Sequence, residues 1–505
     1  MVSRRGSETK AIVCVLTDRI RISNQWVSHL SFAGLLGVAG FVFAQQHGLF
    51  RNLNNLKLFS GREKDSGDDS FLVPGLQNLG NNCFLNVILQ ALASCKDFRS
   101  FLQWVLEDAR GSLAGEQEEQ LPLTFALSAL LQELGTVGSR RSVSNPRKVM
   151  VTLTDYAKNF NLTSQQDAAE ALLHLISSLQ EEIVVCYRPS QSSNLSDILF
   201  SRNLRMLAPS EGLHGLMELK RWHKHLRGPF DGILGSTLMC RTCSSQISLE
   251  FQFFHTLPLS PLLHHGGYNI MSGCTLEHCL KKFLNTEKVE NYFCYRCWHG
   301  AALKYLSVIG AAETEIEKLR SCGGEDQCDC KTSLHLQRMP WSNSYSHILK
   351  QLIIARFPKV FAYSLKLDVK LLCIQVQRAS FNMFEEFKLS GHIAFPLVLN
   401  LSLFTPSSIG VNIEERIEMS SEYQKPEASK NHGMYRLVTV VEHFGRTGSG
   451  HYTVYRSVRV FSQEEEEEDC DEDLSWFSIS DSEVCRVSES DVLGAEASLL
   501  FYERL

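Results

Sequence analysis

The spacing of apolar residues predicts two helices in the first half of the chain. After Cys83, apolar side chains recur every three or four residues, at Leu85, Ile88, Leu89 and Leu92, which is one face of a helix. A similar stripe follows Asp167, at positions 168, 172, 175, 176 and 179. The glycine-containing stretch 75–82 precedes the first helix, so Cys83 is expected at or beside a helix N-terminus.

The second half of the chain is dominated by β-like runs. Apolar and polar residues alternate in part over 371–378, and 435–444 is a strongly apolar run. A glycine turn at 445–450 separates that run from a return strand that starts at His451, which predicts a hairpin. A strand rather than a helix follows the glycines, so this is not a phosphate loop.

The N-terminal region is expected to carry a membrane anchor. Residues 27–44 contain no Asp, Glu, Lys or Arg, and at 1.5 Å per residue such a helix nearly spans the ~30 Å hydrocarbon core. A cleaved signal peptide and a buried core helix are the alternatives. The predicted organisation is a basic segment 1–26, one transmembrane helix 27–44, a tether 45–73 and a catalytic domain 74–505. Basic residues on both sides of 27–44 give no orientation.

Composition narrows the class of protein. The 505 residues are 44% hydrophobic, enough for a sizeable core. The formal net charge of −6 argues against a general nucleic-acid binder, which is usually basic. The 16 cysteines are not spaced like a secreted disulfide scaffold, which favours a reducing compartment.

Four of the cysteines form two matched C-x-x-C pairs, Cys240 with Cys243 and Cys294 with Cys297. Two such pairs can supply four thiolates to one structural zinc. The alternative is two unrelated pairs. The intervening residues predict protruding β fingers over about 230–300. Cys322, Cys328 and Cys330 form a separate cluster without an obvious fourth ligand, and we expect these thiols to be free.

Cys83 and His451 are the candidate catalytic pair. A helix N-terminus favours negative charge and therefore a thiolate, which is the nucleophilic form of cysteine. A histidine presented by a glycine turn is a candidate general base. The alternatives are a small buried cysteine and a structural histidine. A polar residue within 474–484 could accept a hydrogen bond from the histidine ring and orient it.

These stretches together resemble the ubiquitin-specific protease family of deubiquitinases. The resemblance runs from about residue 74 to 505 and is carried by segments that share one order along the chain. They are the cysteine box at 75–90, the Gln-Gln-Asp box at 165–173, the paired C-x-x-C motifs, the Gly-His-Tyr-Thr-x-Tyr box at 450–455 and the Phe-Tyr pair at 501–502. The resemblance implies an α+β fold of the papain-like cysteine peptidase type, with thumb, palm and zinc-pinned β fingers.

The resemblance also implies roles for individual residues. Cys83 would be the nucleophile, His451 the base and Asn78 an oxyanion donor, in an enzyme that hydrolyses the bond at the C-terminal glycine of ubiquitin. The third triad position aligns with Ser480, with Asp481 next to it. Asn82 stands where the family usually has threonine.

Two features extend this resemblance. A serine at the third position, together with an N-terminal anchor, resembles the mitochondrial outer-membrane branch of the family. The expected location is therefore that membrane, with the catalytic domain in the cytosol and ubiquitinated proteins as partners. Residues 360–370 interrupt the family pattern, and we interpret them as an isoform or gene-model insertion.

The sequence is compatible with three other functions. The first is a catalytically weak ubiquitin-binding scaffold on the same fold, for which the neutral Ser480 and the 360–370 insertion argue. The second is a zinc-dependent interaction module. The third is an enzyme that acts on a modifier related to ubiquitin.

Overall fold

The computed structural model describes the following residues: 72–112, 117–138, 140–158, 160–162, 164–187, 228–264, 267–289, 294–322, 329–332, 335–336, 348–355, 370–381, 386–404, 433–459 and 474–505. The predicted segments 1–26 and 27–44, the tether up to residue 71 and residues 360–369 lie outside this set. Among the described residues, no helix has the length and apolarity that a membrane span requires.

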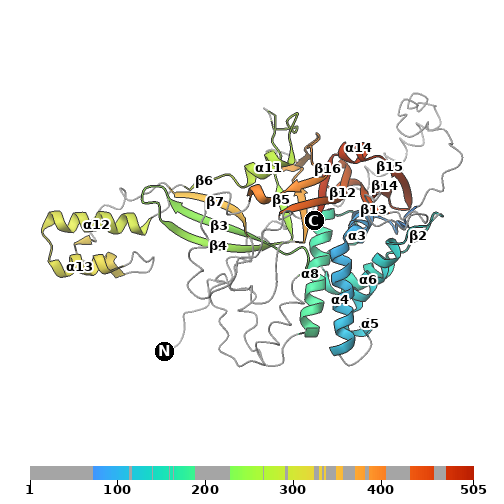
Figure 1. The fold of residues 1–505 in the computed structure, drawn as a ribbon, viewed down its shortest axis with the longest axis horizontal. Helices are drawn as coiled ribbons and strands as arrows, with labels where there is room; N and C mark the ends of the chain where they lie inside the picture. Colours follow the sequence, from blue (N-terminus) through green and yellow to red (C-terminus); the bar gives the residue numbers. More distant parts are fainter. Residues whose placement is uncertain are drawn as a thin grey trace, which may run out of the picture. The chain divides into compact units, whose positions relative to one another are not determined.

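The first part of the described chain is helical, as the apolar spacing predicts (Figure 1). The helices are α3 Cys83–Ser94, α4 Lys96–Ser112, α5 Gln117–Gln120, α6 Pro122–Leu134, α7 Arg147–Tyr156 and α8 Ala168–Tyr187. Helix α3 is buried on all sides, and Asn86 and Gln90 are as buried as its apolar residues. Both amides form hydrogen bonds, as buried polar groups must.

The main sheet has the strand order β15-β14-β13-β12-β16-β8-β5, and β11 pairs with β12. Its strands are β5 Thr256–Leu259, β8 Leu371–Val376, β11 Val398–Asn400, β12 Met434–Arg446, β13 Ser449–Arg459, β14 Leu474–Ser480, β15 Glu483–Val487 and β16 Ala497–Arg504. The predicted strand at 371 and the hairpin around the glycine turn are confirmed, as is the α+β class. The β14–β15 hairpin, whose turn is Asp481–Ser482, was not predicted.

A second sheet has the order β4-β3-β7-β6, and we call it the finger sheet. Its strands are β3 Gly232–Cys240, β4 Gln246–Phe254, β6 Glu287–Val289 and β7 Ile348–Ala355. Strand β7 lies beyond the predicted range of about 230–300, because it returns to pair between β3 and β6. Helices α12 Tyr295–Ile309 and α13 Glu313–Ser321 extend from the end of this sheet that lies away from the main sheet (Figure 1).

Short elements complete the described fold. They are β1 Gly75–Leu76, β2 Val143–Ser144, α11 Leu276–Phe283, the 3-10 turns η3 Asp329–Thr332 and η7 Ser402–Phe404, β9 Ala379–Phe381, β10 Glu386–Lys388 and α14 Glu489–Leu493. Strand β1 pairs in parallel with β2.

One buried arginine fixes α3 against the sheet. Arg456 of β13 donates through Nη1 to Gln90 Oε1 at 2.6 Å and to the Leu134 carbonyl at 3.2 Å, and through Nε to Ser94 Oγ at 3.0 Å. Burial lowers the pKa of Arg456 to about 9. The helix that begins with Cys83 is thereby tied to the strand that carries His451.

Candidate active site

Cys83 is the first residue of α3 and is only 4% exposed. Desolvation raises the pKa of its thiol and the nearby Asp481 carboxylate adds to this, while backbone N–H groups of Tyr452 and Phe84 oppose the rise. The amide hydrogen bonds at the helix N-terminus favour the thiolate, as expected, but burial outweighs them. Removal of the Cys83 proton needs a base.

His451 lies near the start of β13, directly before Tyr452, whose backbone N–H approaches Cys83. The Nε2 atom of His451 is 2.7 Å from Ser480 Oγ at the end of β14. When Nε2 carries the proton and donates to the hydroxyl, Nδ1 is the basic nitrogen of the ring. Adjacent strands thus bring the predicted histidine and serine together.

Asp481 follows Ser480 but has different contacts. Its Oδ2 accepts from Asn78 Nδ2 at 2.8 Å, and its Oδ1 accepts from Asn86 Nδ2 at 2.7 Å. The residue has a φ of 51°, a conformation that Asp and Asn adopt more readily than most side chains. The geometry therefore gives the two neighbours separate contacts: Ser480 with the imidazole ring, and Asp481 with the loop before α3.

That loop is held by a second buried amide. Asn82 Oδ1 accepts from the Leu79 N–H at 2.6 Å, and its Nδ2 donates to Asn86 Oδ1 at 2.9 Å. Asn78 Oδ1 accepts from the Gly80 N–H at 2.9 Å. The amide of Asn82 thus joins the loop to α3.

Gly75 permits the close approach of the loop to the β14–β15 turn. A Cβ at this position would lie 2.8 Å from Ser482 Cα and 2.9 Å from the Asp481 carbonyl oxygen. The Leu76 N–H donates to that carbonyl at 2.8 Å. Backbone contact between β1 and the turn therefore places the Asp481 carboxylate beside Asn78.

The Gln-Gln-Asp box holds the residues on both sides of His451. Gln165 makes two hydrogen bonds of 3.1 Å with the N–H and carbonyl of Gly450. Asp167 caps α8 through the Ala169 N–H at 2.8 Å, and its other oxygen accepts from the Tyr452 hydroxyl at 3.3 Å. Local sequence did not reveal these contacts, because the box reads as an ordinary amphipathic helix and its partners lie 285 residues away.

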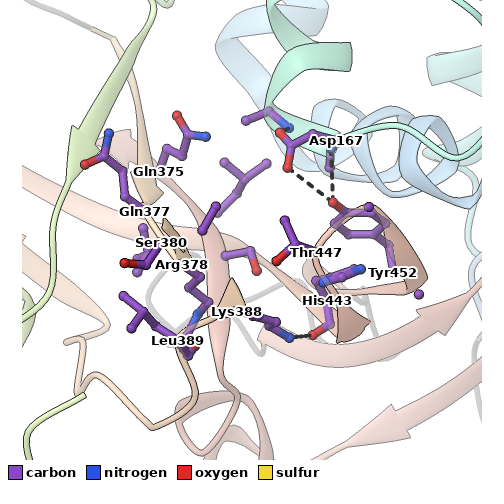
Figure 2. Close-up of a pocket in the computed structure, with 18 of the residues that line it drawn as sticks. Asp167, Gln375, Gln377, Arg378, Ser380, Lys388, Leu389, His443, Thr447 and Tyr452 are labelled. Carbon is purple, nitrogen blue, oxygen red and sulfur yellow. Dashed lines mark hydrogen bonds between the residues drawn. The ribbon is translucent and has the colours of Figure 1, made fainter. Parts of the chain in front are cut away.

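A cavity of about 710 Å³ adjoins Cys83. Figure 2 shows Gln375, Gln377 and Arg378 on one side of it and Asp167, Thr447 and Tyr452 on the other. Lys388 donates to the carbonyl of His443 at its base. Burial lowers the pKa values of both Lys388 and His443. The cavity is lined mainly by polar side chains and leads to the thiol, so it can accept an extended peptide.

The four predicted zinc ligands meet at the end of the finger sheet. Cys240 Sγ is 3.6 Å from Cys297 Sγ, and Cys243 Sγ is 3.7 Å from Cys294 Sγ. Four sulfur atoms that bind one zinc tetrahedrally at ~2.3 Å lie about 3.8 Å apart. The cluster therefore fits a metal that prefers thiolates.

An α+β chain with a cysteine at a helix start, a histidine on a facing strand and a polar side chain behind it has the arrangement of a papain-like cysteine peptidase. Comparison with known proteins gives the family. Residues 74–502 match the model of the family described as "Ubiquitin carboxyl-terminal hydrolase". The chain belongs to this family, and the prediction of a cysteine-type deubiquitinase is confirmed at that level.

Two relatives illustrate the range of similarity. "Ubiquitin carboxyl-terminal hydrolase 27" of Arabidopsis thaliana is 98% identical over 505 residues, with both chains covered completely. "Ubiquitin carboxyl-terminal hydrolase 30" of Homo sapiens is 26% identical over 460 residues, with 86% of this chain and 84% of the relative covered.

A solved structure agrees at the level of the fold. It is the "SAGA Ubp8/Sgf11/Sus1/Sgf73 DUB module bound to ubiquitin aldehyde", whose matching chain has a TM-score of 0.50 and 19% identity, with 85% of this chain and 69% of that chain covered. The papain-like fold of this family is thus confirmed for the catalytic region.

Proposed function

We propose that this chain hydrolyses the bond between the C-terminal glycine of ubiquitin and a lysine, with Cys83 as the nucleophile and His451 as the base. The observation that carries the proposal is the pairing of His451 with Ser480 at 2.7 Å, one residue away from the backbone N–H that contacts Cys83. Similarity to a fold solved with ubiquitin aldehyde supports ubiquitin as the partner.

The chemistry starts with the Cys83 proton. Because the thiol pKa is raised, Nδ1 of His451 takes this proton as the sulfur attacks the carbonyl carbon. Ser480 accepts from Nε2–H and stabilises the imidazolium, less strongly than a carboxylate would. The imidazolium then protonates the leaving lysine amine, and water hydrolyses the thioester.

Asn78 is placed to stabilise the tetrahedral oxyanion. An amide NH₂ has two donor hydrogens, and the bond to Asp481 uses one of them. We assign the second hydrogen to the oxyanion, together with backbone N–H groups near Cys83. Loss of one such donor typically costs about 10²–10³ in rate.

The finger thiols would hold a structural zinc. Four cysteine ligands close the coordination shell and leave no position for water, so Cys240, Cys243, Cys294 and Cys297 would stabilise the finger sheet and take no part in the chemistry. The polar cavity beside Cys83 would accept the extended ubiquitin tail.

A ubiquitin derivative with a C-terminal electrophile tests the activity. We expect a covalent adduct on the wild-type chain and on Cys485→Ala, an exposed cysteine on β15, and none on Cys83→Ala. No adduct on the wild type, or an undiminished adduct on Cys83→Ala, would exclude the proposed nucleophile.

A second candidate is a catalytically weak ubiquitin-binding scaffold. Two observations favour it, namely the neutral Ser480 behind His451 and the raised pKa of the Cys83 thiol. This candidate predicts tight ubiquitin binding and very slow turnover of di-ubiquitin. Rapid turnover of di-ubiquitin by the wild-type chain that is lost in Cys83→Ala would exclude it.

We further propose that residues 27–44 anchor the chain in the mitochondrial outer membrane with the catalytic domain in the cytosol. The support is the charge-free apolar stretch and the family resemblance. Removal of residues 1–50 should release the chain into the soluble fraction after cell lysis. A truncated chain that stays on mitochondria would refute this stretch as the sole attachment.

A further inference from the structure

The helical tip beyond the finger sheet has its own small core. Helices α12 and α13 and the turn η3 enclose a few buried side chains: Trp298, Ala302, Leu306, Ile316, Leu319, Cys330 and Leu336. A core of this size contributes little against the chain entropy lost on folding, and natural units this small are usually strengthened by a disulfide or a metal.

Three metal-binding side chains meet at the edge of this core. A nitrogen of His299 and the sulfur atoms of Cys322 and Cys330 all lie within 4.8 Å of one another. They come from the first turns of α12, the residue after α13 and η3. His299 is 5% exposed and Cys330 is 9% exposed. The sequence predicted free thiols here, because His299 lies 23 residues before Cys322 and only the turn between α12 and α13 brings the histidine back to the cysteines.

The ring of His299 is oriented as in a metal site. Its Nδ1 lies 2.7 Å from the carbonyl oxygen of Tyr295 in the preceding helical turn. Metal-binding histidines commonly donate one ring N–H to such an acceptor, which fixes the tautomer and directs the other nitrogen at the metal. Nε2 is then the nitrogen that would bind the ion.

His299 cannot belong to the four-thiol cluster. Cys297 of that cluster and His299 are two residues apart on α12. Successive residues of an α-helix are rotated by about 100°, so these two side chains leave the helix about 200° apart, on opposite sides. Helix α12 therefore presents one ligand to each of two separate clusters.

We propose that His299, Cys322 and Cys330 bind a second zinc ion, which holds α13 and η3 to α12. One imidazole and two thiolates form a donor set typical of zinc. Binding would link three segments of the tip that share only a small core. The proposal is independent of catalysis, since these residues lie outside the cavity beside Cys83.

Metal content of the purified full chain, measured by mass spectrometry, tests the proposal. We expect about two zinc ions per wild-type chain, and the loss of one in His299→Gln or Cys322→Ser. The cysteine variant His299→Cys should keep both ions because it restores a ligand. Cys243→Ser should lose the other ion, and Cys485→Ser should lose none.

Two further measurements keep a folding defect from being mistaken for a lost ligand. Replacement of zinc by cobalt should give visible absorption in which the cluster with nitrogen and the four-thiol cluster contribute separately, and His299→Cys should shift the first contribution only. One zinc per wild-type chain that is unchanged in His299→Gln, or a Cys322–Cys330 disulfide after thiol blocking, would overturn the proposal.

Discussion

The catalytic centre and the helical tip of the fingers are held together in different ways. Around Cys83 and His451, hydrogen bonds connect segments that lie hundreds of residues apart, such as Gln165 with Gly450 and Asn78 with Asp481. They rest on a core shared by the helices and the main sheet. The tip has a core of its own with few members, and cysteine and histidine clusters join its segments.

The difference reflects two requirements: the catalytic centre needs precise positioning of its side chains, and the fingers need only a stable attachment of their segments. Catalytic groups have to be held to within about 0.5 Å by neighbours that are themselves fixed, which a network of directional hydrogen bonds in a large core achieves. The fingers have only to stay folded at a distance from the chemistry, and a bound metal ion would achieve this with three or four side chains.

The largest effect is expected from removal of metal, which should affect the fingers and not the catalytic centre. Structural zinc contributes about 10–16 kcal/mol in small zinc-dependent folds, so a chelator should cause a large rise in amide hydrogen exchange at the finger end, around Cys240 and in α12. The β12–β13 hairpin should keep its protection. Added zinc should restore the original pattern. Equal loss of protection in both regions would show that they are one cooperative unit.

Among the groups that position the catalytic centre, Asp481→Ala should have a larger effect than Ser480→Ala. It releases Asn78 and Asn86 at once, and we expect kcat to fall by about 10²–10³, as for loss of an oxyanion donor. Ser480→Ala removes one neutral hydrogen bond of about 1–1.5 kcal/mol, or about tenfold. Steady-state kinetics with a fluorogenic ubiquitin substrate measure both.

The double variant Asn78→Ala/Asp481→Ala tests whether Asp481 acts through Asn78. If Asp481 acts by positioning Asn78, the double variant should be no slower than the slower single variant. Multiplied effects would mean that the carboxylate acts on His451 or on the substrate instead.

Arg456→Ala should destabilise the catalytic domain by about 3 kcal/mol, because it leaves Gln90 and the Leu134 carbonyl buried without their donor. Arg456→Met fills the space with an apolar side chain and should cost less. Urea unfolding followed by tryptophan fluorescence compares the two. A loss in the methionine variant equal to that in the alanine variant would assign the effect to the charge-assisted bonds alone.

Gln165→Glu should slow turnover about tenfold, since a carboxylate still accepts from the Gly450 N–H but cannot donate to the Gly450 carbonyl. Gln166→Glu, whose amide bonds Asn161 and Ser164 instead, is the matched control. Equal rates in the two variants would mean that the two hydrogen bonds between Gln165 and Gly450 do not position His451.

The smallest expected effect concerns the thiol pKa. The Asp481 carboxylate helps to raise the pKa of Cys83 above its ordinary value, so the thiol is protonated at neutral pH and its thiolate fraction grows only as pH rises toward that pKa. Asp481→Asn should lower the pKa and speed alkylation of Cys83 by iodoacetamide at pH 8, even though turnover falls. Unchanged alkylation would assign the raised pKa to burial alone.

Sequence patterns predicted the elements better than their contacts. The helix after Cys83, the strand at 371 and the hairpin before His451 all follow from local spacing of apolar residues and glycines. The Ser480 candidate came from the family resemblance, and its contact with His451 arises because β13 and β14 are neighbours. The Asp481 contacts with two asparagines were not foreseeable, because they depend on an approach of β1 that only Gly75 allows.

The fingers illustrate the same limit. Paired C-x-x-C motifs predict a metal cluster, since the two ligands of each pair are close in sequence and therefore close in space. The cluster of His299 with Cys322 and Cys330 has no such local signature. Strand β7 was missed for a related reason, because its pairing partner β3 begins more than a hundred residues earlier.

The positive φ of 51° at Asp481 has a consequence for anyone who tries to improve this enzyme. Glycine suits that backbone conformation best, so a search for thermostable variants at this turn would be drawn to Asp481→Gly. Such a variant would keep the hairpin and lose the carboxylate that holds Asn78. Selection for stability alone would thus lower the catalytic rate while it preserved the fold.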